Sequence, residues 1–366
     1  DLLRAVTMGY DVGARICEAF GADEFSKRLT PSCMPGSFVA AAVSSALLRH
    51  DQAQVRHTLT YAAQQASGTG LWKRDREHIE KTFDYAGMGS RNGVMAATMV
   101  SAGFTAAEDP FSGDPNVFTA LAEKPAPEKL LANLGTKFAV SDTSLKKWTV
   151  GGPLQTVADS MADLLKDPAV TPANVAHVTV ELPAYSLSIV DNASTPDLCA
   201  QHLVAMMIVD HGATFSSIHD AARMKDPKVL AVRSLVELKG SKELDIAKPA
   251  RQAIVTIQTK DGKTLTKHTV YVRGLKENPM GWDEVEAKAI DLMNPILGQA
   301  RARRLVASIK GLDTLGPVAK LRLLLQALIF VLSAHEVRQL IGPQARIAGR
   351  GVAARVRSNG NLIIAA

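Results

Sequence analysis

The sequence lacks the cysteine pattern and the hydrophobic runs that mark several protein classes. Its 366 residues include only three cysteines, Cys17, Cys33 and Cys199, which lie far apart and form no CxxC pair. This argues against a disulfide framework or a zinc site and favours a reducing, cytoplasmic setting. The longest apolar run, 323–332, is interrupted by Gln326 and is too short to span a bilayer. We therefore expect a cytoplasmic protein with no membrane partner.

Aromatic residues are also scarce, at 5%, and the positive charge is unevenly spread. The net charge is +6, but residues 327–366 hold five arginines and one glutamate, which accounts for +4 and leaves +2 on the rest. Few aromatics and a nearly neutral body argue against a nucleic-acid partner. We interpret 327–366 as an atypical basic tail, either a flexible extension or read-through sequence. A basic arm for nucleic acid or anionic membrane is the alternative.

The hydrophobic and charged fractions, 46% and 21%, are those of an ordinary globular protein, and the length allows two domains. Residues 1–145 predict a helical domain, because small and apolar residues recur at helical spacing in several segments. These segments are 1–20, 37–50, 56–68 and 92–102. The stretch 136–148 is predicted to be strand-like and then loop. Because the chain starts at Asp1 rather than Met, we expect part of this domain to be missing.

The pattern changes to a mixed one in 146–298, which predicts an α+β domain. Alternating apolar residues predict strands, and Asp261–Gly262 is a strong hairpin turn between the last two. The predicted strands are 176–183, 232–240, 252–260 and 264–274, with helices at 197–212, 215–224 and 283–292. Helices within 299–326 are predicted to return to the helical domain. The fold class is therefore α+β, with an all-helical domain followed by a smaller mixed one.

The stretch "KKWTVGGPLQT" (146–156) combines two lysines with a Gly-Gly-Pro turn that opens a helix. Free backbone N–H groups of Gly151 and Gly152, together with Lys146 and Lys147, would suit an anion. Gln155 can orient a carboxylate or an amide, but its own amide does not exchange a proton near neutral pH. The other interpretation of the lysine pair is a solvated surface. Apolar residues at helical spacing predict that one face of the helix is core: Leu154, Val157, Met161 and Leu164.

Six segments, spread over roughly residues 1–326, form a recognisable series. The first three are "AVTMGYDVGARI", "YAGMGSRNGVMAATMVSAGFTAAEDPFSG" and "KKWTVGGPLQTVAD", and the others are "TPDLCAQHLVAMMIVD", "ARMKDPKV" and "ENPMGWDEVEAKAIDLMNPILG". In this order they resemble the MmgE/PrpD family, the group around 2-methylcitrate dehydratase. The resemblance implies a homodimer with an active site between a helical and an α+β domain. It also implies dehydration, decarboxylation or epimerisation of small di- and tricarboxylates, without a metal or organic cofactor.

The sequence departs from the family pattern at positions that matter. Thr30 stands where the family has a histidine in an "RFHPT"-like turn, and Gln155 stands where it has another. The family lysine before the glycine turn falls near Thr82, with Lys81 adjacent. An Asp/Thr/His segment that usually precedes the present start is absent. These positions, Thr30, Lys81, Thr82 and Gln155, are predicted to bind substrate in an altered subfamily.

Two residues are candidates for the proton transfer that such reactions need. His202 lies on a mostly apolar helix, where some relatives place a tyrosine that points into the cleft; a hydrogen-bonded core histidine is the alternative. Tyr85 lies beside the glycine turn, where relatives often have histidine; an ordinary aromatic at the cleft edge is the alternative. Arg91, in "GMGSRNGV", is predicted to bind a carboxylate, since a guanidinium does so bidentately.

These residues predict a lyase that hydrates or dehydrates a small di- or tricarboxylate through an enolate-like intermediate. A general base and an acid for the leaving hydroxyl are required, while cations stabilise the developing charge. The alternatives are an isomerase, epimerase or decarboxylase on a related carboxylate, or a catalytically inactive fragment. The remaining histidines show no HExxH or other metal-ligand spacing, so we expect no metal.

Overall fold

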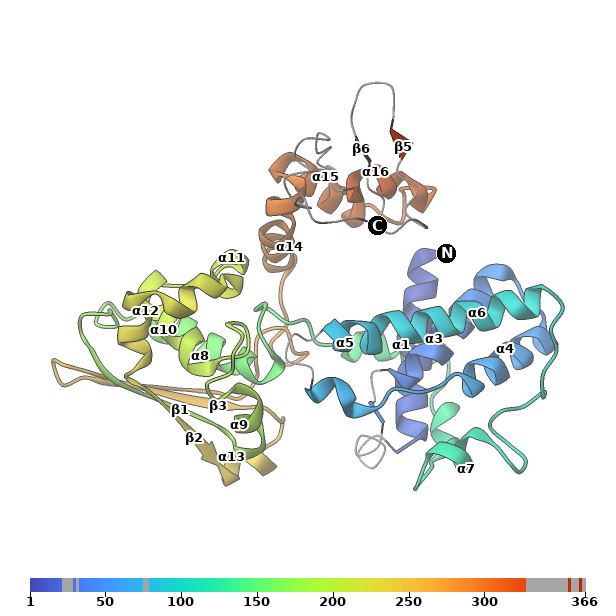
Figure 1. The fold of residues 1–366 in the computed structure, drawn as a ribbon, viewed down its shortest axis with the longest axis horizontal. Helices are drawn as coiled ribbons and strands as arrows, with labels where there is room; N and C mark the ends of the chain where they lie inside the picture. The colour runs from blue at the N-terminus through green and yellow to red at the C-terminus, as the bar shows by residue number, and fades with distance from the viewer. Residues whose placement is uncertain (22–28, 31–32, 75–78, 327–354, 357–361, 364–366) are drawn as a thin grey trace, which may run out of the picture. The chain divides into compact units, whose positions relative to one another are not determined.

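The computed structural model describes the chain except for residues 22–28, 31–32, 75–78, 327–354, 357–361 and 364–366. The chain divides into two compact units, Asp1–Thr143 and Ser144–Ala366 (Figure 1). The first unit is helical and the second combines helices with a sheet, which confirms the predicted α+β fold class. None of the described helices combines the length and the apolar character that crossing a membrane would require.

Four helices form the body of the first unit: α1 (Leu2–Ala19), α3 (Met34–Leu48), α4 (Gln52–Gln64) and α6 (Gly89–Ser101). The predicted helices are confirmed, and their ends follow from local chemistry. Arg49 ends α3 in the left-handed conformation, at φ 58°. Asp51 caps α4, where its side chain accepts a hydrogen bond from Gln54 N at 2.8 Å and the Gln54 side chain accepts one from Asp51 N.

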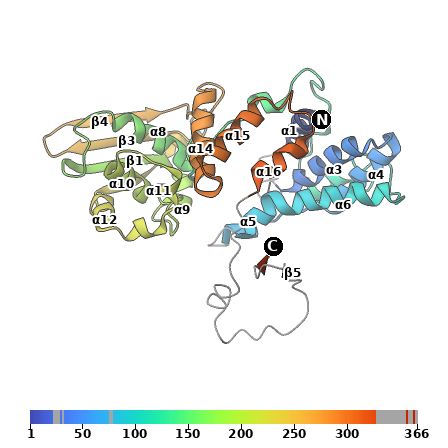
Figure 2. The same ribbon diagram turned by 90° about the horizontal axis from the view of Figure 1, so that it is seen from above.

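Helix α3 lies at the centre of this unit and contacts α1, α4 and α6 (Figure 2). The close approach of α3 and α6 depends on Gly93, because a Cβ there would lie 2.4 Å from the Ser37 carbonyl oxygen. Phe20 and Phe118 pack with ring centroids 4.8 Å apart, within a buried core that also includes Met34 and Phe38. Short segments complete the unit: η1 (Gly70–Arg74), α5 (Ile79–Thr82), the π-helix η2 (Phe83–Met88), α7 (Val117–Leu121), η3 (Pro127–Leu130) and η4 (Ala139–Asp142).

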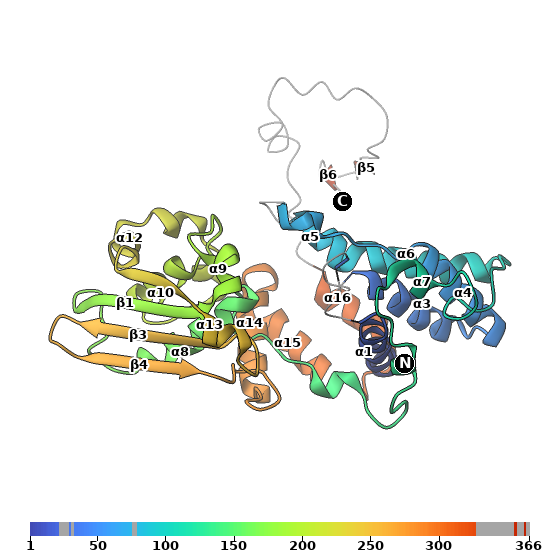
Figure 3. The same cartoon turned by 90° about the horizontal axis from the view of Figure 1, so that it is seen from below.

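The second unit is built on a four-stranded sheet in the order β2-β1-β3-β4, of which Figure 3 labels β1, β3 and β4. Its strands are β1 (Val175–Pro183), β2 (Val236–Ser241), β3 (Ala253–Thr259) and β4 (Thr264–Thr269). β1 pairs with β2 in parallel and with β3 antiparallel, and β3 and β4 form the predicted hairpin. Alternate residues of β3 are buried, as the period of a half-buried strand requires.

Helices pack on this sheet and form the largest buried core of the described chain. α8 (Gln155–Leu164) contacts β3 and β4, and α10 (Ala200–Asp210) contacts α8 and β2. The predicted core face of α8 is confirmed, since Leu154, Val157 and Met161 have no exposed surface. The other helical segments up to β3 are η5 (Gly152–Leu154), α9 (Ala184–Val190), α11 (Phe215–His219), η6 (Ala221–Lys225), α12 (Pro227–Arg233) and α13 (Lys242–Ile246).

The C-terminal part begins with α14 (Trp282–Leu297) and α15 (Gln299–Lys310), which pack on each other. η7 (Val318–Leu321) and α16 (Arg322–Leu325) follow. The return of 299–326 to the helical domain stays a prediction. The tail 327–366 lies outside the described residues, apart from the paired strands β5 (Arg355–Val356) and β6 (Leu362–Ile363).

Two expectations about secondary structure are wrong. The stretch 136–148 holds the short helix η4 rather than a strand, because Ser141 N and Thr143 N bond to carbonyls three residues earlier. Residues 232–233, predicted to begin a strand, instead end α12, so that β2 starts at Val236.

Candidate functional site

The Gly-Gly-Pro turn before α8 is held by hydrogen bonds to Asp197 and by the Gln155 side chain. Gly151 N donates to the Asp197 carbonyl at 2.9 Å, so the prediction of a free N–H at this residue is wrong. The buried Gln155 amide donates to the carbonyls of Trp148 (2.8 Å) and Val150 (3.0 Å) and accepts from Trp148 N (3.2 Å). Its hydrogen-bonding capacity therefore goes largely into fixing the loop that carries Lys146 and Lys147.

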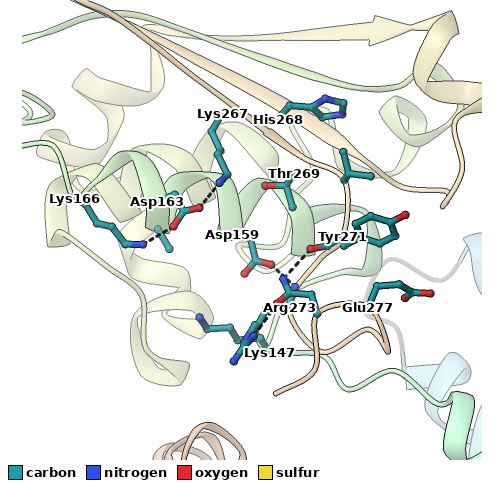
Figure 4. A pocket seen from close by; sticks show the side chains of 13 residues that line it. Lys147, Asp159, Asp163, Lys166, Lys267, His268, Thr269, Tyr271, Arg273 and Glu277 are labelled. Atoms are coloured by element: carbon teal, nitrogen blue, oxygen red, sulfur yellow. Dashed lines mark hydrogen bonds and ion pairs between the residues drawn. The ribbon is translucent and has the colours of Figure 1, made fainter. Parts of the chain in front are cut away.

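A first cavity in the second unit, of about 490 Å³, lies beside this loop (Figure 4). The Asp159 carboxylate connects two walls of this cavity, because it accepts hydrogen bonds from Trp148 Nε1 at 2.7 Å and from Arg273 N at 2.6 Å. Eight side chains that carry charge or can carry it line the cavity: Lys147, Asp159, Asp163, Lys166, Lys267, His268, Arg273 and Glu277.

The cations of the first cavity are paired with carboxylates. Lys166 and Lys267 both contact Asp163 at 2.6 Å, and their hydrogen bonds hold the pKa of that carboxyl below its usual range. Arg273 forms a fork with Glu284, and Lys147 Nζ lies 3.9 Å from the same carboxylate. This pairing leaves the first cavity with little uncompensated positive charge for an incoming anion.

The Arg273–Glu284 pair is expected to contribute to the stability of the protein against acid. The Arg273 hydrogen bonds lower the pKa of Glu284 from 4.5 to about 2. Stability from this group is therefore complete above pH 4.5 and is lost as the pH falls towards 2. We expect Glu284→Gln to lower the free energy of unfolding by about 1 kcal/mol at pH 7, a small value because the pair is one-third exposed to solvent. The variant should also lose less stability than the unaltered protein when the pH falls from 4.5 towards 2.

Urea unfolding between pH 2.5 and 7 measures this effect. Glu286→Gln is the matched control, because Glu286 pairs with Lys310 on the exposed surface and should cost about 0.5 kcal/mol or less. If the Glu284 variant and the unaltered protein lost the same stability at low pH, the proposed contribution of the Arg273–Glu284 pair would be wrong.

A second cavity, of about 150 Å³, lies on another side of the same loop. Its charged lining residues are all basic: Lys146, Arg251 and Arg273. Gly152 and Gln155 line it as well, so three of the predicted substrate-binding residues come together here. Sequence reasoning missed Arg251, because no motif surrounds it and it lies 99 residues after Gly152.

In the first unit, three predicted residues, Thr30, Lys81 and Tyr85, lie around Trp72. Trp72 Nε1 donates to Thr30 Oγ1 at 3.1 Å, and its ring meets Tyr85 edge-on at 5.2 Å. Lys81 Nζ lies 5.0 Å from the Trp72 ring centroid and 5.4 Å from that of Tyr85. Tyr85 is 36% exposed and lines a separate cavity of about 730 Å³ between α1 and α3. Sequence reasoning did not single out Trp72, which connects these residues.

The buried Asp84 carboxylate lies on the same π-helix as Tyr85. It accepts a hydrogen bond from the Cys33 thiol, and burial with this neighbouring charge raises the pKa of Cys33 to about 12. A thiol with that pKa is a poor nucleophile. Asp84 Oδ2 is buried and has no hydrogen-bond partner in the described chain.

Two other predicted residues of the first unit, Arg91 and Thr82, are exposed. Arg91 donates to Asn92 Oδ1 through Nε and Nη2, at 3.1 and 2.9 Å, and lies over the Phe83 ring at 5.6 Å. Thr82 is exposed at the end of α5. Neither lines the cavity beside Tyr85, so their role in binding stays a prediction.

His202 lies apart from both cavities of the second unit. It has no exposed surface, and neither ring nitrogen has a hydrogen-bond partner in the described part of the chain. Burial, and then the nearby Arg233 and Arg223, lower the pKa of His202. The structure does not bring it together with Lys147, which lines the first cavity, and its catalytic role stays a prediction.

Across the described residues, no three His, Cys, Asp or Glu side chains cluster in a way that could hold a metal ion. The arrangement can bind anions through Lys146 and Arg251. In the first unit, the partly exposed phenol of Tyr85 lies beside the ammonium group of Lys81.

Comparison with protein-family models gives two matches. The MmgE/PrpD N-terminal domain matches residues 1–130, and the MmgE/PrpD C-terminal domain matches residues 148–314. Both domains are represented, so the comparison gives no support to the prediction that part of the helical domain is missing. No curated protein matches the chain at a significant level.

Proposed function

Since the chain belongs to the MmgE/PrpD family, whose domains are those of dehydratase- and lyase-like proteins, we propose that it is a carbon–oxygen lyase. Its substrate would be a small hydroxy di- or tricarboxylate that loses water, or the corresponding unsaturated acid that gains it, without a cofactor. A homodimeric state, implied by the same resemblance, belongs to this proposal, as does a cytoplasmic location, expected from the three widely spaced cysteines.

The observation that carries the choice of substrate is the second cavity. All of its charged lining residues are basic, and Lys146 and Gly152, two residues expected to bind substrate, contribute to it. Removing a proton next to a carboxylate places negative charge on the carboxylate oxygens as the bond breaks. Cations that bind this charge more tightly in the transition state than in the ground state lower the barrier.

Tyr85 is the better supported candidate for proton transfer. Its phenol is partly exposed, lines a cavity and lies beside Lys81, whereas His202 has no exposed surface through which to reach a substrate. A general acid or base must come within hydrogen-bond reach of the proton that it moves. In this proposal Tyr85 moves the proton and Lys81 supplies positive charge.

The test is an assay of the purified chain with a panel of 2-hydroxy di- and tricarboxylates. Dehydration creates a carbon–carbon double bond conjugated to a carboxylate, which absorbs in the near ultraviolet, and we expect such absorbance with at least one substrate. Tyr85→Phe should lower kcat at least 100-fold, the usual scale of general acid–base catalysis.

Three results of the assay would contradict the proposal. Epimerised product without new absorbance would indicate an isomerase, released carbon dioxide a decarboxylase, and no reaction with any member of the panel an inactive chain. Tyr10→Phe is a matched control, since Tyr10 lines the same cavity on α1 and should leave kcat unchanged.

A further inference from the structure

Arg251 has an unusual backbone conformation for an arginine. Its φ is +67°, in the left-handed region that residues with a side chain rarely adopt. Strained residues of this kind persist only where their surroundings hold them, and they concentrate at functional sites. Here Thr156 Oγ1 donates to the Arg251 carbonyl at 3.0 Å, and the buried Gln252 donates to the Pro249 carbonyl at 3.1 Å. The loop before β3 is therefore fixed on both sides of Arg251.

The Arg251 guanidinium lies against the backbone of Gly152. A Cβ on Gly152 would lie 2.9 Å from Nη1 and 3.6 Å from Cζ of Arg251, so the missing side chain makes room for the guanidinium. Within the described residues, this guanidinium has no hydrogen bond and no ion pair, although it is exposed and lines the second cavity. It is a cation held at a cavity wall without a protein anion to neutralise it.

The two cavities differ in whether their cations are paired with carboxylates of the protein. In the first cavity Lys166, Lys267 and Arg273 each contact a carboxylate of the protein. In the second cavity no acidic residue lines the wall, and Leu145, Val270 and Val272 make part of it apolar. A carboxylate that enters the second cavity can therefore form a charge-assisted hydrogen bond with Arg251 without competition from a carboxylate of the protein.

We propose that Arg251 binds one carboxylate of the substrate in the second cavity, beside Lys146, and so makes the protein select di- and tricarboxylates over monocarboxylates. This inference rests on the proposed function for the identity of the substrate class. At about 150 Å³ the second cavity is smaller than the first, at about 490 Å³, which suits one carboxylate arm rather than a whole tricarboxylate. The planar fork of arginine can grip both oxygens of that arm.

Binding of an unreactive probe tests the assignment independently of turnover. Tricarballylate has three carboxylates and no hydroxyl group, and propionate has a single carboxylate. By calorimetry, we expect Arg251→Gln to weaken tricarballylate binding at least tenfold and to lower the preference of the protein for tricarballylate over propionate. Arg49→Gln is the matched control, because Arg49 is also an arginine at a positive φ, 58°, but lies in the first unit. It should change neither affinity more than twofold.

A second variant, Gly152→Ala, tests the same site in case the Arg251→Gln variant does not fold. Gly152→Ala places a methyl group where only the mobile end of Arg251 lies, so it should displace the guanidinium and leave the thermal midpoint nearly unchanged. We expect it to weaken tricarballylate binding about tenfold. If turnover is found, both variants should raise KM for the productive substrate tenfold or more and change kcat by less than threefold.

The outcomes separate the two proposals. Turnover with KM and tricarballylate affinity unchanged in both variants would overturn the role of Arg251 and leave the lyase assignment standing. Binding that depends on Arg251, without turnover of any hydroxy acid, would support the carboxylate site and overturn the lyase. Failure of the unaltered protein to bind tricarballylate would overturn the site.

Discussion

Replacing Gly274 by alanine is expected to destabilise the protein by about 3–5 kcal/mol, among the largest effects of any single substitution. Gly274 has φ +102°, and a Cβ there would lie 1.8 Å from the Leu145 carbonyl oxygen and 2.9 Å from its carbon. Both atoms belong to the backbone, so no side-chain rotation relieves the clash. The two segments would have to separate.

This separation would also disturb the second cavity. Leu145 N donates to the Gly274 carbonyl at 2.9 Å, and Gly274 N donates to the Asn278 carbonyl at 2.8 Å. The segment that carries Lys146 is therefore attached to the chain at Gly274. Loss of this attachment should weaken carboxylate binding even in the fraction of molecules that remain folded.

Urea unfolding at pH 7 measures the loss of stability, with Gly262→Ala as the matched control. Gly262 also has a positive φ, +88°, but nothing lies within 4 Å of its Cβ position. It should therefore cost only the strain of the left-handed conformation, about 1–2 kcal/mol. Equal losses for the two variants would show that Gly274 and Leu145 do not make this close approach.

Replacing His202 by leucine is expected to stabilise the protein by about 1–3 kcal/mol, the cost of leaving a buried polar group without a partner. His202 has no exposed surface, and Nδ1 and Nε2 both lack partners in the described chain. Leucine has a similar volume and no polar atom, so it keeps the packing of α10 and removes the desolvation penalty. Most core substitutions destabilise, so the sign of this change is diagnostic.

The same variant should remove one source of acid sensitivity. Burial lowers the pKa of His202 below 6.5, so the unfolded chain takes up a proton at a higher pH than the folded one. Stability from the neutral imidazole is therefore complete above pH 6.5 and is lost as the pH falls from 6.5 towards the lower folded pKa. The gain from His202→Leu should be larger at pH 5.5 than at pH 7.5.

Urea unfolding at these two pH values, with turnover measured alongside, checks both statements. His177→Leu is a control, since His177 is exposed on β1 and pairs with Glu237 at 3.2 Å. A loss of stability in the His202 variant would indicate that its nitrogens have partners in solution. A stable variant that has lost turnover would restore His202 as a catalytic residue.

Local patterns in the sequence were sufficient to predict much of the fold. The spacing of Leu154, Val157 and Met161 predicted the buried face of α8, and Asp261–Gly262 predicted the hairpin between β3 and β4. Both rest on interactions between residues close in the chain, where periodicity and turn chemistry act directly. The parallel pairing of β1 with β2 has no such local signal, because more than fifty residues separate the two strands.

The candidate site was less predictable, because the role of a polar side chain depends on the groups that surround it in the folded protein. Gln155 was expected to orient substrate, yet its amide fixes the loop that it belongs to. Thr30 and Tyr85 stand where relatives have histidine, and Lys81 is adjacent to the place of a family lysine; in the structure, all three contact Trp72. Such contacts join segments far apart in the chain.

By itself, the sequence determined the helical and mixed domains, the core faces of the helices and the membership of a family, since each depends on residue types in a local order. The tertiary structure alone decided which cations are left without a protein anion. Lys147 is paired with Glu284, 137 residues further along, while Arg251 lies beside Gly152 without one. Electrostatic interactions depend on distance in space, and chain folding sets that distance.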